Sequence, residues 1–349
     1  MKVGVLSVVP SPYQRDFFRA LAGHPGIDLE VAYLEDAAPD SPWPKKPLEE
    51  YETLLPGRTL GRGRVRCHSN SRLPDPHRFD AYIVNTALTA LTTQRMFRRL
   101  KGHPNWFFWG EVLRTNGGLK GAIQRRLSAP LGRARAIVAI GSRARTDYQA
   151  RFPASPVEQI PYLCDLSEFR PRPRPDAPPT FLFCGQMIER KGVDLLVQVF
   201  RRLEQDGVAA RLLLAGRETS LIGELPGNVE MVGFQAPDRL PELFERADVF
   251  VLPSRHDGWG VVINQAIGAG LPIIASTAVG AAIDLVEPGV NGLQVEPGEL
   301  DSLERAIRQL AGDHRARQRM SVASTQLASQ LAPGVGAERW YQLLQCASS

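Results

Sequence analysis

Cysteine is scarce in this chain of 349 residues, and the spacing of the cysteines argues against both a zinc-binding and a disulfide-linked domain. The four cysteines lie far apart, with no Cys-x-x-Cys pair and no cluster of cysteine and histidine. This spacing provides neither a zinc site nor a disulfide framework, so we expect reduced, partly buried thiols. The cysteines are Cys67, Cys164, Cys184 and Cys346.

Long apolar runs are also missing. No run approaches the roughly 18–20 apolar residues that a membrane-spanning helix needs. The first apolar run, from Val3 to Val9, stops at Pro10, and no small-residue cleavage site follows it. Because a signal peptide would need such a site, we interpret this run as the first strand of a cytoplasmic protein.

The chain lacks a dinucleotide-binding fingerprint where one would be expected. A strand at 3–9, a helix at 13–22 and a strand at 29–33 form a βαβ opening, which predicts a doubly wound parallel sheet. The first loop contains no Gly-x-Gly-x-x-Gly pattern. A nicotinamide-linked enzyme is therefore disfavoured. Tyr13 follows this loop, and we consider it as a ligand-facing residue or as a packing partner of Phe17.

The charge of the chain is uneven. Residues 1–165 hold 24 lysines and arginines against 15 aspartates and glutamates, whereas residues 166–349 hold 18 against 22. The net charges of +9 and −4 indicate an acidic acceptor or an anionic membrane surface as a partner of the first half. The alternative interpretation is solvated arginine on helix faces, and both remain open.

The rest of the first half predicts further strands and helices around a long excursion. Residues 36–80 are rich in proline and charge, including Pro39 and Pro42, and predict only weak strands. Glu111 follows a strand at 106–109, and the carboxyl end of a strand is where catalytic groups gather. It is a candidate acid or acceptor-binding group, or else a surface carboxylate. The remaining predicted elements are strands at 81–85 and 136–140 and helices at 92–100, 119–127 and 143–151.

The helix predicted at 119–127 is amphipathic. Leu119, Ile123 and Leu127 give it an apolar face, and Arg125 and Arg126 make it basic elsewhere. Such a helix could lie on anionic lipid. Ordinary packing of the apolar face against the protein is the alternative.

Residues 170–179 read Arg-Pro-Arg-Pro-Arg-Pro-Asp-Ala-Pro-Pro. Proline at this density fits neither a helix nor a central strand and behaves as a stiff, extended linker. We predict the domain boundary here, between a first domain at 1–169 and a second at 180–330.

The second half contains a strand, a glycine-bearing loop, a helix and a further strand between residues 249 and 276. Gly258 and Gly260 allow backbone to approach a ligand closely, because no Cβ intrudes. The N–H groups at the start of the following helix favour an anion. These features predict a phosphorylated ligand at residues 257–261.

The same stretch resembles the signature of the GT4-type retaining glycosyltransferases, in which seven residues separate two acidic ones. Asp257, the turn Gly258-Trp259-Gly260, and Gln265 occupy those positions. An upstream loop, Gly-Gln-Met-Ile-Glu-Arg-Lys-Gly, is similar to the family's phosphate-binding loop.

That loop provides the cations which the resemblance assigns to the donor diphosphate. Lys191 matches the usual lysine, and Gln186 stands where an arginine is usual. Arg190 would supply the missing charge. The resemblance thus implies Asp257, Lys191 and Glu111 as catalytic residues, with Tyr13 on the acceptor side. The donor-binding residues would be Arg190, Gln186, Gly258, Trp259, Gly260 and Gln265.

The resemblance implies an α/β protein of the GT-B class, with two Rossmann-like doubly wound parallel-sheet domains facing a central cleft. A C-terminal helix at 331–349 would cross back onto the first domain. The implied activity is transfer of a sugar, with retention, from a UDP- or GDP-sugar to a glycan or lipid-linked acceptor.

The chain contains no Asp-x-Asp motif, so we expect no metal and no cofactor beyond the nucleotide-sugar co-substrate. Contact with nucleic acid is not expected, and contact with the inner face of the cell membrane would be peripheral. The two departures at Gln186 and Gln265 leave an alternative open, namely a weakly active or inactive GT-B protein with a binding or regulatory role.

Overall fold

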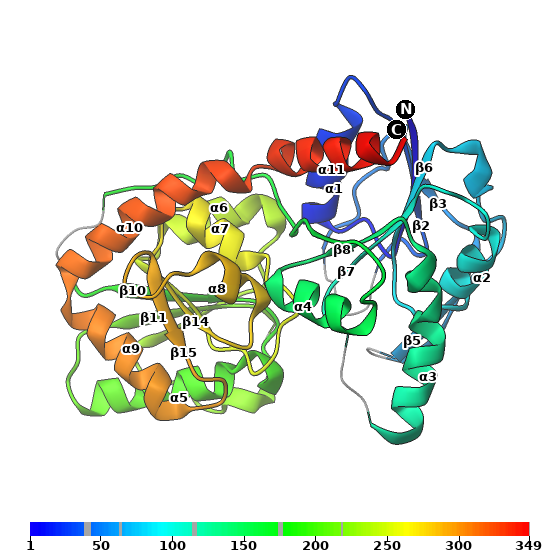
Figure 1. Cartoon of the computed structure of the whole chain (residues 1–349). Coiled ribbons are helices and arrows are strands. Elements are labelled where there is room, and N and C mark those ends of the chain that lie inside the picture. The colour runs from blue at the N-terminus through cyan, green and yellow to red at the C-terminus, as the bar shows by residue number, and fades with distance from the viewer. Residues whose placement is uncertain (38–42, 63–64, 114–116, 174–176, 218, 349) are drawn as a thin grey trace. The chain divides into compact units, whose positions relative to one another are not determined.

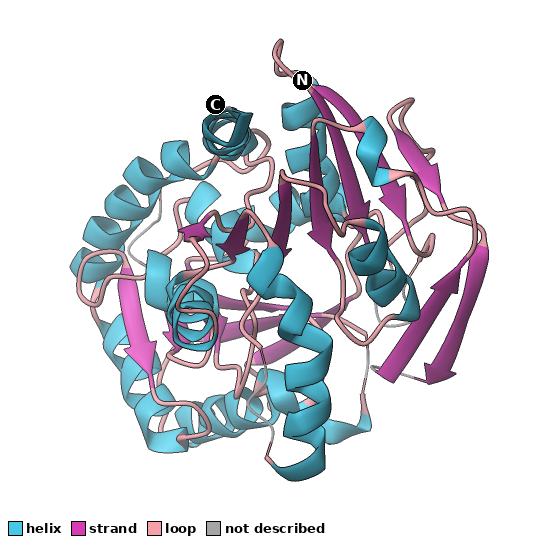
Figure 2. Ribbon diagram, turned by 45° about the vertical axis from the view of Figure 1, so that its right-hand side comes forward, coloured by secondary structure: helices cyan, strands magenta, loops and turns pink. Residues whose placement is uncertain are grey.

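The computed structural model describes residues 1–37, 43–62, 65–113, 117–173, 177–217 and 219–348 (Figure 1). The chain divides into two compact units, of which the first comprises Met1–Tyr162 with Pro333–Ser349 and the second comprises Leu163–Ala332. Each unit is built on a parallel sheet covered by helices (Figure 2). This architecture confirms the predicted class of two Rossmann-like α/β units.

The first unit holds a seven-stranded sheet in the order β3-β2-β1-β6-β7-β8-β9 and a separate antiparallel hairpin of β4 and β5. All neighbouring strands of the larger sheet are parallel. Its strands are β1 (Lys2–Ser7), β2 (Asp28–Tyr33), β3 (Glu52–Leu54), β4 (Gly57–Arg62), β5 (Val65–Asn70), β6 (Ala81–Asn85), β7 (Trp106–Gly110), β8 (Ala136–Ala139) and β9 (Val157–Gln159). Its helices are α1 (Pro12–Ala22), α2 (Leu91–Arg99), α3 (Gly118–Ser128), α4 (Ser142–Arg151) and α11 (Pro333–Ser348).

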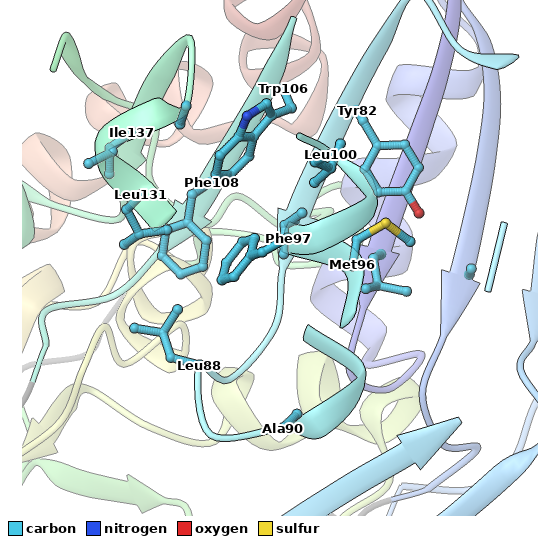
Figure 3. Close-up of a cluster of buried hydrophobic side chains, with 14 of the residues drawn as sticks. Tyr82, Leu88, Ala90, Met96, Phe97, Leu100, Trp106, Phe108, Leu131 and Ile137 are labelled. Carbon is cyan, nitrogen blue, oxygen red and sulfur yellow. The ribbon is translucent and has the colours of Figure 1, made fainter. Parts of the chain in front are cut away.

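One face of this sheet carries a core that is rich in aromatic side chains. Strands β6, β7 and β8 are buried along their whole length, as expected for parallel strands covered on both faces. Figure 3 shows Met96 and Phe97 of α2 lying beside Tyr82, Trp106 and Phe108 of the strands. The Phe97 ring lies 5.5 Å from that of Trp106, between centroids.

The other face of the sheet is covered by α1 and by the C-terminal helix α11. Trp340 of α11 is wholly buried and lies 5.6 Å from Trp109 and 6.1 Å from Phe107, between ring centroids. Phe17 of α1 packs against the same Trp109 at 5.0 Å. The last helix therefore completes the core of the first unit, where the sequence placed it.

The second unit holds a six-stranded parallel sheet in the order β12-β11-β10-β13-β14-β15. Its strands are β10 (Thr180–Cys184), β11 (Arg211–Ala215), β12 (Val229–Gly233), β13 (Val249–Leu252), β14 (Ile273–Ser276) and β15 (Gly292–Val295). Its helices are α5 (Val193–Gln205), α6 (Leu240–Glu245), α7 (Val262–Gly268), α8 (Gly280–Leu285), α9 (Leu300–Gly312) and α10 (His314–Ala328).

The division between the units falls before Leu163, earlier than the linker predicted at 170–179. The residues just before that linker are packed, because Leu166 and Phe169 lie against Gly268 of α7. Phe169 also meets the ring of Phe244 at 5.4 Å. The segment therefore belongs to the core of the second unit. Residues 174–176 of the predicted linker, and Pro39 and Pro42 of the predicted excursion, lie outside the described residues.

Within the described ranges, no helix combines the length and the apolar character that crossing a membrane requires.

Candidate functional site

The two loops singled out in the second half of the sequence leave adjacent strands of one sheet. Strand β10 pairs with β13, and the strand order reverses between them, because β11 lies on one side of β10 and β14 lies on the far side of β13. In open parallel sheets, ligands bind beyond the carboxyl ends of the strands at such a switch point. The loops at 185–192 and 253–261 both begin there.

The side chains of Lys191 and Asp257 meet at this switch point. The Lys191 ammonium donates a hydrogen bond to Oδ2 of Asp257. Nη1 of Arg190 lies 3.8 Å from the other carboxylate oxygen. The Lys191 and Asp257 side chains are 13% and 14% exposed, so a ligand can reach them although they are largely shielded. Two cations around one carboxylate leave a net charge of +1, which favours an anion.

Backbone hydrogen bonds fix the two loops against each other. Nη1 of Arg190 donates to the His256 carbonyl oxygen at 2.7 Å. The Arg255 N–H donates to the Arg190 carbonyl oxygen at 2.8 Å. The relative position of the cations and Asp257 is therefore set by the main chain and by a side-chain tie, rather than by the ion pair alone.

A second ion pair, which could not be predicted from the sequence, holds the loop at 185–192 in place. Arg255 donates from Nη1 and Nη2 to the two carboxylate oxygens of Asp194, each at 2.7 Å, and also donates to the Glu189 carbonyl oxygen. The hydrogen bonds to Asp194 raise the pKa of Arg255. Asp194 lies in the first turn of α5, where a carboxylate is stabilised by the helix dipole. The position of Asp194 near a helix start was the one signal in the sequence for this ion pair, and nothing there indicated Arg255 as its partner.

Two glycines permit the close approach of backbone on which the site depends. Gly192 has φ of 72°, and a Cβ at this position would lie 2.2 Å from the carbonyl oxygen of Pro253. Gly260 has φ of 86°, and a Cβ there would lie 2.8 Å from Cγ1 of Val279 and 3.5 Å from Oδ2 of Asp257. The first glycine lets the two loops touch, and the second lets the turn pack closely against Val279. Gly258 contributes a carbonyl oxygen that packs against Gly280.

Trp259 is a correction to the set of residues expected to bind the ligand. Its side chain is 1% exposed, and its Nε1–H donates to Oδ1 of Asn264 at 3.2 Å. A ring buried in this way supports the turn from inside and presents no surface to a ligand. The sequence predicted that Trp259 faces a ligand because it lies in the glycine-bearing loop. In the structure, its side chain points into the core.

The start of α7 offers fewer free amides than the sequence suggested. The N–H groups of Ile263 and Asn264 donate to the carbonyl oxygens of Gly260 and Val261, each at 2.9 Å. Those amides are therefore occupied within the turn. Gln265 lies on α7 and is half-buried, and Gln186 is half-buried in the loop after β10. By contrast, α5 begins directly after Gly192, so the positive end of its dipole lies beside Lys191.

Cys184, at the end of β10, is not a nucleophile in this arrangement. Burial raises the pKa of its thiol to about 12, with the nearby Lys191 charge opposing that rise. The thiol is thus protonated at neutral pH, and the chemistry of the site rests on the ion-paired cluster.

The two candidates in the first half of the sequence belong to the first unit. Tyr13, in the first turn of α1, packs between the rings of Trp43 and Tyr162, with centroids at 6.2 and 5.2 Å. Glu111 directly follows β7 and is exposed, and its carbonyl oxygen accepts a hydrogen bond from the Tyr148 hydroxyl at 2.8 Å. Burial raises the pKa of Tyr162, and Tyr13 and Glu111 raise it further. Both candidates therefore lie near the same phenol.

The second unit is thus a parallel α/β unit with a cationic cluster at its switch point, an arrangement that suits an anionic ligand. Residues 166–326 match the family model for glycosyl transferases group 1. All candidate residues of the second unit lie within the matched range.

Curated relatives match parts of the chain. The chain is 27% identical over 210 residues to alpha-D-kanosaminyltransferase of Streptomyces kanamyceticus, covering 54% of each. It is 28% identical over 200 residues to the GDP-mannose-dependent alpha-(1-6)-phosphatidylinositol monomannoside mannosyltransferase of Mycobacterium tuberculosis, covering 50% of this chain and 52% of that one. The matches span about half the length of these relatives.

Among solved structures, HepE of Anabaena in complex with UDP is similar over 99% of this chain and 100% of that one. The TM-score is 0.75 and the sequences are 16% identical. At this identity the likeness concerns the fold, and it extends over both units.

Proposed function

We propose that this protein transfers a sugar from a nucleotide-diphosphate sugar to a glycan or lipid-linked acceptor. The observation that carries the proposal is the contact between Lys191 and Asp257, with Arg190 beside them, at the switch point of the second unit. Lys191 and Asp257 lie 66 positions apart in the chain, and the mechanism proposed below requires the cations and the carboxylate to lie side by side.

The cations would bind the diphosphate of the donor. Negative charge grows on the oxygen of the departing diphosphate, and fixed cations stabilise that charge in the transition state. Lys191 would exchange its bond to Asp257 for a bond to the phosphate, and Arg190 would stay anchored to the His256 carbonyl oxygen. The positive end of α5 adds to the same field.

Asp257 would bind the sugar itself. Once Lys191 turns to the phosphate, the carboxylate is free to accept hydrogen bonds from donor hydroxyls. Gln265 would hydrogen-bond the ribose with its amide, and Gln186 would contact the phosphates without contributing charge. In this mechanism the acceptor attacks on the face that the diphosphate leaves, with retention, and a diphosphate oxygen takes the acceptor proton.

The relatives support the class of donor. The Mycobacterium tuberculosis protein is named for its dependence on GDP-mannose, and the Anabaena protein is in complex with UDP. We therefore propose a UDP- or GDP-sugar as co-substrate, with no metal and no further cofactor. Tyr13 and Glu111 of the first unit are proposed to serve the acceptor.

A second candidate function is binding of a nucleotide sugar without turnover. Its motivation is that Gln186 and Gln265 replace residues that carry charge in similar enzymes. The two candidates differ in one measurable respect, since the binding protein would hold the donor without releasing nucleotide diphosphate.

The test combines donor binding with turnover. We expect calorimetry over a panel of UDP- and GDP-sugars to find at least one ligand, and a coupled assay for nucleotide diphosphate to detect slow hydrolysis or transfer. Lys191→Ala should lower kcat/KM by about 30- to 1,000-fold, because one charged donor to a developing oxyanion contributes about 2–4 kcal/mol.

The matched control is Arg239→Ala, which removes a cation whose side chain is 63% exposed and paired with Glu242. It should leave both binding and turnover unchanged. Binding without any release of nucleotide diphosphate would favour the second candidate. A folded protein that binds no member of the panel would refute both.

A further inference from the structure

Helix α3 of the first unit presents Leu119 and Ile123 to solvent and buries Gly121 and Ser128. Leu119 is 77% exposed and Ile123 is 51% exposed, whereas the buried positions of the helix are Gly121 and Ser128. Leu119 and Ile123 are four residues apart and so lie on one face, and Gly121 and Ser128 share another. A helix of a globular protein normally turns its apolar stripe inward. Of the apolar face predicted from the sequence, Leu119 and Ile123 therefore do not pack against the protein, whereas Leu127 does.

Basic residues flank the exposed apolar ridge. Lys120 and Arg126 are exposed and stand three residues before and after Ile123, which places one on each side of it. Arg125 in the last turn is exposed as well. The helix sequence, Gly-Leu-Lys-Gly-Ala-Ile-Gln-Arg-Arg-Leu-Ser, contains no acidic residue. The face thus combines apolar side chains at its centre with positive charge at its margins.

The helix is anchored at its C-terminal end. Leu127 is partly buried and packs against the core of the first unit, and Nε2 of Gln94 in α2 donates to its carbonyl oxygen at 3.1 Å. Exposure rises from Leu127 toward Leu119, away from this anchor. Figure 1 shows α3 at the periphery of its unit.

We propose that this face of α3, defined by Leu119, Lys120, Ile123 and Arg126, docks the protein onto an anionic lipid bilayer. Leucine and isoleucine would enter the boundary between headgroups and acyl chains, and the two cations would contact the lipid phosphates. With 11 residues, α3 is too short to cross a bilayer and would lie along the surface.

A second copy of the chain fits this face poorly. Two exposed apolar side chains provide far less than the area that stable dimers bury. A symmetric dimer through the same patch would also bring its cations together. The proposal does not rest on the transferase activity, because the face lies in the first unit and needs no nucleotide.

The test is vesicle flotation with the full chain. We expect the protein to float with mixed phosphatidylcholine–phosphatidylglycerol vesicles, more weakly with phosphatidylcholine alone, and less as salt rises. Lys120→Gln combined with Arg126→Gln should lower the partition coefficient about thirtyfold. Leu119→Ser combined with Ile123→Ser should lower it at least about tenfold. Because all four side chains are exposed, the melting temperatures should not change.

Helix α10 of the second unit provides matched control positions. Val322 is 58% exposed and Arg319 is exposed, so Val322→Ser combined with Arg319→Gln removes the same kinds of group from another helix. This variant should float like the unaltered protein.

The proposal is overturned if the unaltered protein does not float, if the α3 variants float as well as it does, or if the α10 variant loses binding equally. Self-association that Leu119→Ser abolishes, without flotation, would assign the face to a second copy instead. Calorimetry of soluble nucleotide sugars should give the same donor affinity for all these variants, which separates this result from a failure of the proposed activity.

Discussion

The two units share an architecture but fill the switch points of their sheets differently. Between β10 and β13 of the second unit, the loops meet through charge, with Lys191 bonded to Asp257. Between β1 and β6 of the first unit, the contact joins neutral groups, because Nε2 of Gln14 in α1 donates to Oδ1 of Asn85 in β6 at 2.5 Å. A charged group in a ligand needs opposite charge held in place. We therefore expect the anion of the proposed donor to bind at this sheet edge of the second unit rather than at the same edge of the first.

The largest expected effect concerns the contact between the two loops of the second unit. Gly192→Ala should lower the free energy of unfolding by about 3 kcal/mol, since a side chain would be forced into a left-handed backbone position and against the Pro253 carbonyl oxygen. Urea denaturation measures this, and hydrogen exchange should locate the loss in the second unit.

Gly207→Ala is the control for that prediction. Gly207 has a similar φ of 68°, but its Cβ position has open space around it. The loss there should be only about 1 kcal/mol. Equal losses at the two glycines would mean that the close approach of the loops contributes nothing.

Next in size is the effect of removing the carboxylate at the charged switch point. Asp257→Asn should lower kcat about a hundredfold while KM for the donor changes little, because both cations remain. Steady-state kinetics with saturating acceptor would measure this. Asp301→Asn, at a side chain that is 77% exposed, should change neither constant. An unchanged kcat for the Asp257 variant would remove this residue from the mechanism.

The clamp between Arg255 and Asp194 should matter for donor binding more than for turnover. Arg255→Lys keeps the charge but loses the two parallel hydrogen bonds, and it should weaken donor affinity about tenfold. Asp194→Asn should act similarly, and the double variant should be no weaker than either single one. A double-mutant cycle by calorimetry tests this coupling. Additive losses would show that the two residues act separately.

The smallest expected effect is a gain. Gln265→Glu should tighten donor binding by a few-fold at most, because a carboxylate is a stronger acceptor for ribose hydroxyls than an amide. Isothermal titration with the best donor of the panel would detect it. A large loss would mean that the half-buried Gln265 has a structural task on α7 instead.

Most strands and helices could be predicted from the sequence, because buried parallel strands appear as continuous apolar runs. The strand at Ala81–Asn85 and the strand at Val249–Leu252 lie where they were predicted. Strand β9 was missed, since its three residues, Val157–Gln159, include two polar ones. The strand β3 within the proline-rich excursion depends on a distant partner, because the buried carboxylate of Glu52 is held by Arg15 at 2.6 Å.

The site was predictable in part. The meeting of Lys191 and Asp257 followed from a motif and from the topology, whereas the Arg255–Asp194 clamp joins residues 61 positions apart and leaves no periodic signal. The burial of Trp259 was also invisible, since a residue type does not reveal on which side of a turn its ring lies. The direction of the apolar face of α3 escaped prediction for the same reason.

The position of Trp340 bears on the order of events during synthesis. Trp340 lies in the core of the first unit, whose sheet is made entirely from the first 162 residues. Domains generally fold in the order in which they leave the ribosome. The first unit therefore cannot complete its core until the whole of the second unit has been translated. Until then, the surface around Phe107 and Trp109 stays uncovered. We infer that a nascent chain paused shortly before residue 340 would be a strong client for chaperones.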